Sequence, residues 1–295
     1  MKPYRSSLFV PGNKPNWMKK AVNYEADVLV LDLEDSVPAQ EKVEARAMVR
    51  DALPLLKENG QRCSVRINGF ASELTLGDLE GIICPELESV AIPKIETVDE
   101  MKQIDTLLTH LEMRQGIELG TIKTPLNLET AKAMYNAYDI AISSPRVTDI
   151  ALAAGPGGDA SRSVGYVWSK EGRETLYLRS KIVLDSRAAG IQYPTISSWW
   201  NIRDLEGLER DARLNRQLGF RGQAVIHPSH IPIVNAVFSP TTEEIEYSKG
   251  LIAAMAKAEK KGTAAVVYRG DMVDYAMLQT AKEMIEFTES IGMVA

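Results

Sequence analysis

Three carboxylates follow a short apolar run near the start of the chain. Residues 28–31 read Val-Leu-Val-Leu, and Asp32, Glu34 and Asp35 come directly after them. Four successive apolar residues indicate a strand that is buried on both faces, as in a parallel α/β sheet. Acidic groups at the end of such a strand are costly to bury unless a positive charge lies opposite them. They form either a capped turn, in which Asp35 or Ser36 caps the helix that starts near Gln40, or a site for a cation or a cationic side chain.

Further charged and polar residues stand beside other strand-like runs. The set comprises Arg5, Arg66, Asn68, Lys94, Glu96, Glu129, Asp159 and His227. It mixes carboxylates with cations and contains no cluster of Cys and His, so neither zinc nor copper is expected. Glu129 and Asp159 suit Mg²⁺, which keeps several waters and needs few protein ligands. Lys94 and Glu96 read as an ion pair at a strand end, and we leave them out of the predicted catalytic set.

The elements that must position these residues alternate between strand and helix. Strand-like runs occur at residues 7–10, 28–31, 63–67, 89–93, within 118–128, at 149–153, from 190 and at 223–226. A helix-like segment follows each run, and the spacing of about 25–35 residues is typical of βα units. Eight such units predict a (β/α)₈ TIM barrel over residues 1–232. In a barrel of this kind the side chains beyond the carboxyl ends of the strands form the active site.

The remainder, residues 233–295, is predicted to be a C-terminal helical extension. It reads as two helices separated by a loop at residues 266–274. Because the barrel ring is already complete, this segment must pack on the barrel, cover its mouth or reach another subunit.

Composition narrows the function further. The 295 residues are 45% hydrophobic and carry a formal net charge of −6 without a basic block, which argues against nucleic acid and anionic membranes as partners. Cys63 and Cys84 have no metal-ligand spacing and are expected to be buried thiols. The sequence has no apolar signal segment and no run of 18 apolar residues, so we expect a cytoplasmic protein.

An ordered series of short motifs runs along most of the chain. The motifs are Arg5-Ser6, Leu8-Phe9, Pro11-Gly12, Leu31-Asp32-Leu33-Glu34-Asp35-Ser36-Val37, Arg66-Ile67-Asn68, Pro93-Lys94, Glu129-Thr130-Ala131, Leu218-Gly219-Phe220, His227-Pro228-Ser229 and Met272-Val273-Asp274. With this series the chain resembles the HpcH/HpaI aldolase and citrate lyase superfamily, and within it the branch of the citrate lyase β-subunit. The resemblance extends from residue 5 to about residue 290.

The resemblance implies Mg²⁺-dependent cleavage of a short β-hydroxyacyl thioester, such as a citryl, citramalyl or malyl group on CoA or an acyl carrier. It implies that Glu129 and Asp159 are the metal ligands and that Arg66 contacts the substrate. Glu34 and Asp35 are then expected to hold metal-bound waters or to orient Arg66. Asp274 is expected to be an acid/base residue on a C-terminal lid that serves a neighbouring subunit, in a homo-oligomer such as a trimer or hexamer.

Two positions depart from the pattern of the superfamily. The usual Gly-Ala-Glu-Asp is replaced by Gly-Pro-Gly-Gly-Asp at residues 155–159, so that Gly158 stands where a carboxylate is usual. An Asp that is common near the seventh strand is also missing from residues 195–200. We expect the backbone at Pro156 and Gly157 to approach the substrate, and the two changes predict an acyl group that differs from those of related enzymes.

Two other functions remain open from the sequence. One is a class II aldolase that acts on free hydroxy-keto acids, and the extension that carries Asp274 argues against it. The other is a non-catalytic subunit that depends on partner lyase subunits.

Overall fold

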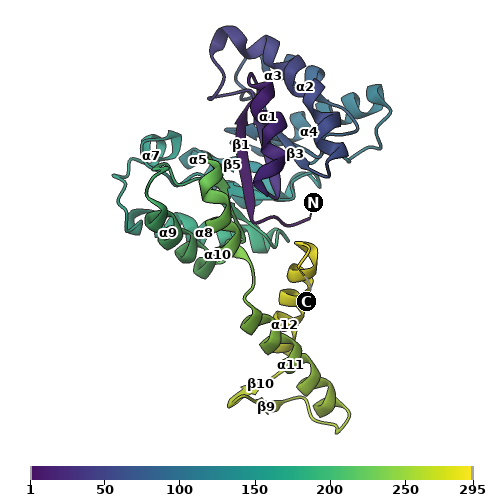
Figure 1. Cartoon of the computed structure of the whole chain (residues 1–295), viewed down its shortest axis with the longest axis vertical. Coiled ribbons are helices and arrows are strands. Elements are labelled where there is room, and N and C mark those ends of the chain that lie inside the picture. Colours follow the sequence, from purple (N-terminus) through teal and green to yellow (C-terminus); the bar gives the residue numbers. More distant parts are fainter. Residues whose placement is uncertain (1, 294–295) are drawn as a thin grey trace. The chain divides into compact units, whose positions relative to one another are not determined.

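The structure is a computed structural model that describes residues 2–293, and its main feature is a closed barrel of eight parallel strands (Figure 1). The strands lie in the order in which they occur along the chain, and the last pairs with the first through Ser6 and Gln223. The predicted (β/α)₈ barrel is therefore confirmed. The barrel strands are β1 (Ser6–Pro11), β2 (Val28–Asp32), β3 (Arg62–Arg66), β4 (Ser89–Pro93), β5 (Leu126–Leu128), β6 (Ile150–Leu152), β7 (Thr195–Ile196) and β8 (Gly222–Val225).

Helices follow the strands and surround the barrel (Figure 1). They are α1 (Pro15–Ala21), α2 (Lys42–Glu58), α3 (Thr75–Ile82), α4 (Val98–Gln115), α5 (Ala131–Tyr135), α6 (Ala137–Ile142), α7 (Asp159–Val164), α8 (Leu176–Ala188), α9 (Leu205–Leu218) and α10 (Ile231–Phe238). Local sequence fixes several of their starts. Thr97 and Glu100 form a capping box at α4, and the Thr130 hydroxyl accepts the amide hydrogen of Ala133 at α5.

Below Arg66, the side chains of β3 and β4 that face the inside of the barrel are small, and those that face outward are larger. On β3 and β4, Val65 and Val90 are fully buried, whereas the alternate residues Ser64, Ser89 and Ala91 line an internal cavity. Successive side chains of a strand point to opposite faces, so this alternation places the apolar packing between strands and helices. Bulky branched residues usually fill the inside of such a barrel. Here the small residues leave it partly open.

The chain divides into two compact units, of which the first is Pro3–Ala236 and the second begins at Val237. The predicted end of the barrel region, residue 232, falls inside α10. The second unit contains α11 (Thr242–Glu259) and α12 (Tyr275–Ser290). The predicted loop at 266–274 is wrong, because β9 (Val266–Tyr268) and β10 (Asp271–Val273) pair there as an antiparallel hairpin.

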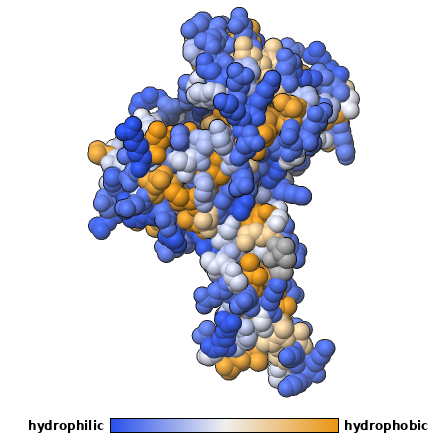
Figure 2. Space-filling view, viewed as in Figure 1, coloured by the Kyte–Doolittle hydropathy of each residue, from blue (hydrophilic) through white to orange (hydrophobic). Residues whose placement is uncertain are grey.

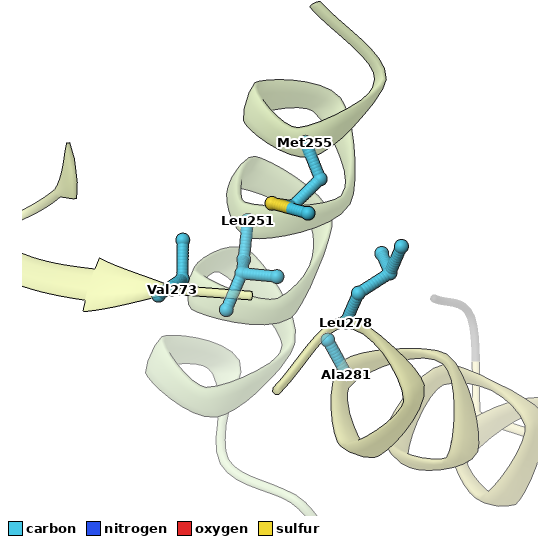
Figure 3. Close-up of a cluster of buried hydrophobic side chains, with 5 residues drawn as sticks. All are labelled: Leu251, Met255, Val273, Leu278 and Ala281. Carbon is cyan, nitrogen blue, oxygen red and sulfur yellow. The ribbon is translucent and has the colours of Figure 1, made fainter. Parts of the chain in front are cut away.

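The second unit has an apolar core of its own. Leu251 and Met255 from α11 meet Leu278 and Ala281 from α12, and Val273 of the hairpin closes the cluster (Figure 3). The hairpin strand β10 leads directly into α12, so packing of Val273 fixes the place at which α12 begins. Asp274 stands at that point and accepts the amide hydrogens of Ala276 and Met277.

Hydrophilic residues cover most of the surface that Figure 2 displays, with apolar residues scattered between them. Within residues 2–293 no helix has both the length and the apolar character that crossing a membrane requires.

One buried ion-pair network joins α4 to the loop before β6. The Arg146 guanidinium is 2% exposed and donates to both oxygens of Glu112, at 2.8 and 2.7 Å. Glu112 also accepts the amide hydrogens of Gly120 and Ile122. Burial alone raises the pKa of Glu112, but the hydrogen bonds from Arg146 and these amides outweigh it and hold the pKa below its usual value.

Replacement of Arg146 is expected to destabilise the barrel, because it leaves the Glu112 charge buried without its partner. We expect Arg146→Met to lower the free energy of unfolding by about 3–5 kcal/mol, measured by urea denaturation. The matched control is Arg114→Met, which removes an exposed pair with Glu80 and should cost less than about 1 kcal/mol. Similar costs for the two variants would contradict a structural role for the network.

Candidate active site

A cavity of about 600 Å³ opens at the carboxyl ends of the barrel strands and continues into the barrel. The charged residues that line it are Asp32, Asp35, Arg66, Glu129, Asp159 and Arg162. Four of these are acids and two are cations, so negative charge is in excess. The cavity is therefore the place where the predicted site residues can act together.

Arg66, at the end of β3, is held by acids that follow β2. Its Nε and Nη2 atoms donate to the two oxygens of Asp32 at 2.7 and 2.8 Å. Its Nη1 atom lies 3.1 Å from Glu34 and 3.4 Å from Asp35. Burial lowers the pKa of Arg66, but the hydrogen bonds and charges of these carboxylates raise it by more. The net shift is upward, so the guanidinium stays charged.

Asp32 also organises the turn that leaves β2. Its side chain accepts the amide hydrogens of Glu34 and Ser36, both at 3.0 Å. Burial raises the pKa of Asp32, and the hydrogen bonds from Arg66 and Ser36 outweigh it and lower the pKa overall. The possible capping role of Asp35 or Ser36 is not realised, because neither the 3₁₀ turn Ala39–Glu41 nor α2 has a side-chain cap among the described residues.

Glu129 follows β5 and has an unusual environment. Within the described chain its carboxylate makes no hydrogen bond or ion pair with protein groups. Burial, and then the charge of Glu34, raise the pKa of Glu129 to about 7. Burial also raises the pKa of Glu34, although its carboxylate oxygens lie 3.1 Å from Arg66 Nη1 and 3.7 Å from Lys94 Nζ. Two carboxylates are thus held near each other with too little compensating charge.

Asp159 begins α7 on the other side of the mouth and pairs with two cations. Lys94 Nζ lies 2.7 Å from Asp159 and 3.7 Å from Glu34, and Arg162 also contacts Asp159. The hydrogen bond from Lys94 lowers the pKa of Asp159. The backbone of Lys94 adopts φ +61°, a left-handed conformation that is costly for a residue with a side chain and that often occurs at functional sites.

Lys94 is the residue that sequence reasoning set aside. Its position directly after β4 was visible in the sequence, but its ion pairs with Asp159 and Glu34 join residues far apart along the chain. Only the closed barrel brings them together. The predicted ion pair of Lys94 with Glu96 is wrong, because Glu96 instead accepts the Thr130 hydroxyl and pairs with Lys132, which supports the start of α5.

The residues present fit a divalent cation. Glu129 and Asp159 offer carboxylate oxygens, and the raised pKa values of Glu129 and Glu34 describe a site that a positive charge would stabilise. No group of three or more His, Cys, Asp or Glu residues with metal-binding geometry occurs within residues 2–293. A donor set this small suits an ion that keeps several waters, such as Mg²⁺, and not one that needs a complete protein shell.

The glycine turn after β6 holds an aromatic side chain at the mouth. A Cβ atom at Gly155 would lie 2.9 Å from the Trp200 indole nitrogen, and Gly157 has φ +64°, so both positions require glycine. Gly157, Gly158 and Trp200 line the main cavity. Pro156 instead lines a small second cavity beside Trp199. The indole of Trp200 thus lies where the departures from the family pattern are concentrated.

Three residues of the wider candidate set lie elsewhere. Arg5 pairs with Asp27 at 2.7 Å, and because it precedes β1 it stands at the amino ends of the strands, opposite the mouth; its inclusion was wrong. Asn68 donates to Asp78 and so fixes the loop after β3. His227 accepts the amide hydrogen of Ser229 in a turn.

Asp274 belongs to the second compact unit, where it caps α12.

Comparison with known proteins matches residues 5–228 to the model of the HpcH/HpaI aldolase/citrate lyase family. The chain belongs to this family. Among its relatives, the citrate lyase subunit beta of Haemophilus influenzae is 36% identical, with 98% of each chain covered. The mitochondrial citramalyl-CoA lyase of Homo sapiens is 33% identical, with 98% of this chain and 86% of the relative covered. The expected carbon–carbon lyase of the aldolase/citrate lyase family is confirmed.

A solved structure of the same family has a similar fold over the whole chain. It is the CitE protein of Mycobacterium tuberculosis in complex with magnesium, acetoacetate and coenzyme A. Its TM-score is 0.73 at 27% sequence identity, and 98% of each chain is covered. The predicted family and the predicted barrel thus agree with both comparisons.

The pKa of Glu129 leads to a pH-dependent stability in protein that is kept free of divalent metal by a chelator. Between pH 5 and 8 the folded state must give up a proton from the buried carboxyl, whereas the unfolded chain has already done so. The wild type should therefore lose about 1–3 kcal/mol of unfolding free energy relative to Glu129→Gln as the pH rises. Urea denaturation at the two pH values measures this, and an equal difference at both would contradict the raised pKa.

Proposed function

We propose that the protein is a Mg²⁺-dependent lyase that cleaves a short β-hydroxyacyl thioester into an α-keto acid and an acetyl thioester. The thioester is of the citryl, citramalyl or malyl type, on CoA or an acyl carrier. The observation that carries the proposal is Glu129, a partly buried carboxylate without a protein partner, facing the same cavity as Asp159 and Arg66. The relatives named above, and the magnesium and coenzyme A in the CitE complex, support it.

Glu129 and Asp159 would hold the metal ion, which supplies Lewis-acid polarisation of the substrate hydroxyl and carboxylate oxygens when it is bound. Lys94 lies 2.7 Å from Asp159. It would then help to hold either the substrate carboxylate or the carboxylates of Asp159 and Glu34. The Arg66 guanidinium is held by Asp32, Glu34 and Asp35, so it cannot turn away from the cavity. Its fixed charge favours the thioester enolate that forms as the carbon–carbon bond breaks.

The enolate must take up a proton before the acetyl thioester leaves. We assign this role to Asp274 of a neighbouring subunit in a homo-oligomer, in keeping with the family resemblance. Gly157 would let the backbone approach the substrate next to Trp200.

The direct test is an assay of keto acid release by the purified full-length protein with Mg²⁺. The panel contains citramalyl-CoA, malyl-CoA, citryl-CoA and free hydroxy-keto acids. We expect turnover of at least one CoA thioester by this chain alone. Glu129→Gln should reduce it by at least about a hundredfold and abolish its dependence on Mg²⁺, because a ligand to the ion is lost.

The control variant is Glu96→Gln, an acid beside the same strand ends that contacts Thr130 and Lys132. It should retain most of the activity. Turnover of free acids alone would indicate an aldolase, and no turnover of any compound would indicate a partner-dependent subunit. Full activity of Glu129→Gln would mean that the metal site is elsewhere.

A second prediction concerns Asp274. Asp274→Asn should lower kcat by at least about a hundredfold, because the amide keeps the cap of α12 but cannot supply the proton. If Asp274 acts in a neighbouring subunit, mixing and reassociating inactive Glu129→Gln and Asp274→Asn subunits should restore part of the activity. Unchanged turnover by Asp274→Asn would remove this residue from the mechanism, and failure to complement would place its action within its own subunit.

A further inference from the structure

The cavity extends far below the charged mouth. On β2 alone, Val28, Val30 and Asp32 all line it. Asp32 lies four residues beyond Val28, and at about 3.3 Å per residue this corresponds to about 13 Å along the strand. The lower end is lined by Tyr4 and Thr195, whose hydroxyl groups both donate to Asp149. The cavity is thus a deep well, closed at its floor by groups that already have partners.

The wall of this well combines the apolar residues Phe9, Val28 and Val30 with smaller ones. The smaller residues are Ser7, Ser64, Ser89, Ala91, Ala151 and Ala224. Ser64 and Ser89 are neighbours in the register of β3 and β4 and are 3% and 1% exposed. Their hydroxyl groups have no hydrogen-bond partner within the protein. Buried hydroxyls without partners are rare because each costs free energy, so two of them side by side in a cavity point to a ligand.

A polar path links these hydroxyls to the mouth. Asn127 precedes Glu129 by two residues and lines the same cavity, so the two side chains lie on one face of the chain at β5. A substrate held at Glu129 and Arg66 can therefore extend a side branch past Asn127 toward Ser64 and Ser89.

The charges exclude one kind of branch. Of the described residues that line the cavity, four are carboxylates and the two cations are Arg66 and Arg162. Arg66 pairs with Asp32, and Arg162 contacts Asp159. A divalent ion would only balance the excess of acids. If the branch carried a carboxylate in addition to the one held at the mouth, no unengaged cation among the described lining residues could pair with it. Burial of that charge in the well would therefore be costly.

We propose that the carbon bearing the substrate hydroxyl carries an uncharged branch with a hydroxyl group of its own, which enters the barrel and hydrogen-bonds with Ser64 and Ser89. This inference rests on the proposed function and names the substrate class of that same site. The product would be a hydroxylated α-keto acid, and oxaloacetate, with its extra carboxylate, would be a poor one.

The test uses the reverse reaction, in which the full-length protein with Mg²⁺ joins acetyl-CoA to keto acids. A bond forms between the acetyl methyl carbon and the keto carbon, and the methyl proton is transferred in net terms to the new hydroxyl, so no further reactant is needed. The acids are glyoxylate, pyruvate and oxaloacetate, together with two pairs matched in size: hydroxypyruvate with 2-oxobutyrate, and 4-hydroxy-2-oxobutyrate with 2-oxopentanoate.

We expect kcat/KM for at least one hydroxylated acid to exceed that of its alkyl partner by about tenfold or more, since a site built to bind a hydroxyl disfavours the analogue without one. Oxaloacetate should be poorer than pyruvate. Ser64→Ala and Ser89→Ala should each reduce the ratio within a pair by about fivefold. The control Ser143→Ala, which removes a hydroxyl that donates to Ile140 O on α6, should leave the ratio as it is.

Equal or higher kcat/KM for the alkyl acids, or a preference for oxaloacetate, would overturn this inference while leaving the lyase activity in place. A hydroxyl preference that survives both serine variants would also overturn it, because the recognition would then lie elsewhere. Absence of condensation with every acid, together with absence of thioester cleavage, would overturn the proposed function itself.

Discussion

An excess of carboxylates at one end of the barrel determines most of what the site can do. Asp32 and Glu34 stand at the end of β2, Glu129 follows β5 and Asp159 follows β6. Arg66 and Lys94 compensate these acids only in part. Burial, and then the charge of Glu34, raise the pKa of Glu129 to about 7, and the charges of Arg66 and Lys94 offset this only in part. A divalent ion would relieve this repulsion. In our proposal, the same shortage of positive charge would disfavour substrates whose branch carries a second carboxylate.

Small side chains on β3 and β4 leave the inside of the barrel partly open, while larger apolar side chains of these strands pack against the helices. Val65 and Val90 are fully buried on one face of β3 and β4, while Ser64 and Ser89 face the interior. This separation lets the fold remain stable while its centre stays partly open. Under our proposals, the charged residues at the mouth would carry out the reaction, and the residues deeper in the cavity would select the substrate branch.

The wrong predictions have different causes. The place of Arg5 at the amino ends follows from its position before β1, whereas the sequence does not show which residues Lys94 meets after β4. Arg5 pairs with Asp27 at the amino ends, and Lys94 meets Asp159 across the mouth. The predicted loop at residues 266–274 is wrong for another reason: the two strands of the hairpin have three residues each and leave almost no periodic pattern.

The barrel and the family could be predicted from the sequence, because strand-to-helix alternation and short motifs are local properties that can be read along the chain. The same reading singled out Glu129 and Asp159 as candidate ligands, but it could not show the partners of these residues. The bidentate pair of Arg66 with Asp32, the isolation of Glu129, and the unpartnered hydroxyls of Ser64 and Ser89 depend on closure of the sheet. Burial and charge compensation are set by neighbours that are distant along the chain, so these features follow from the tertiary structure and not from any local pattern.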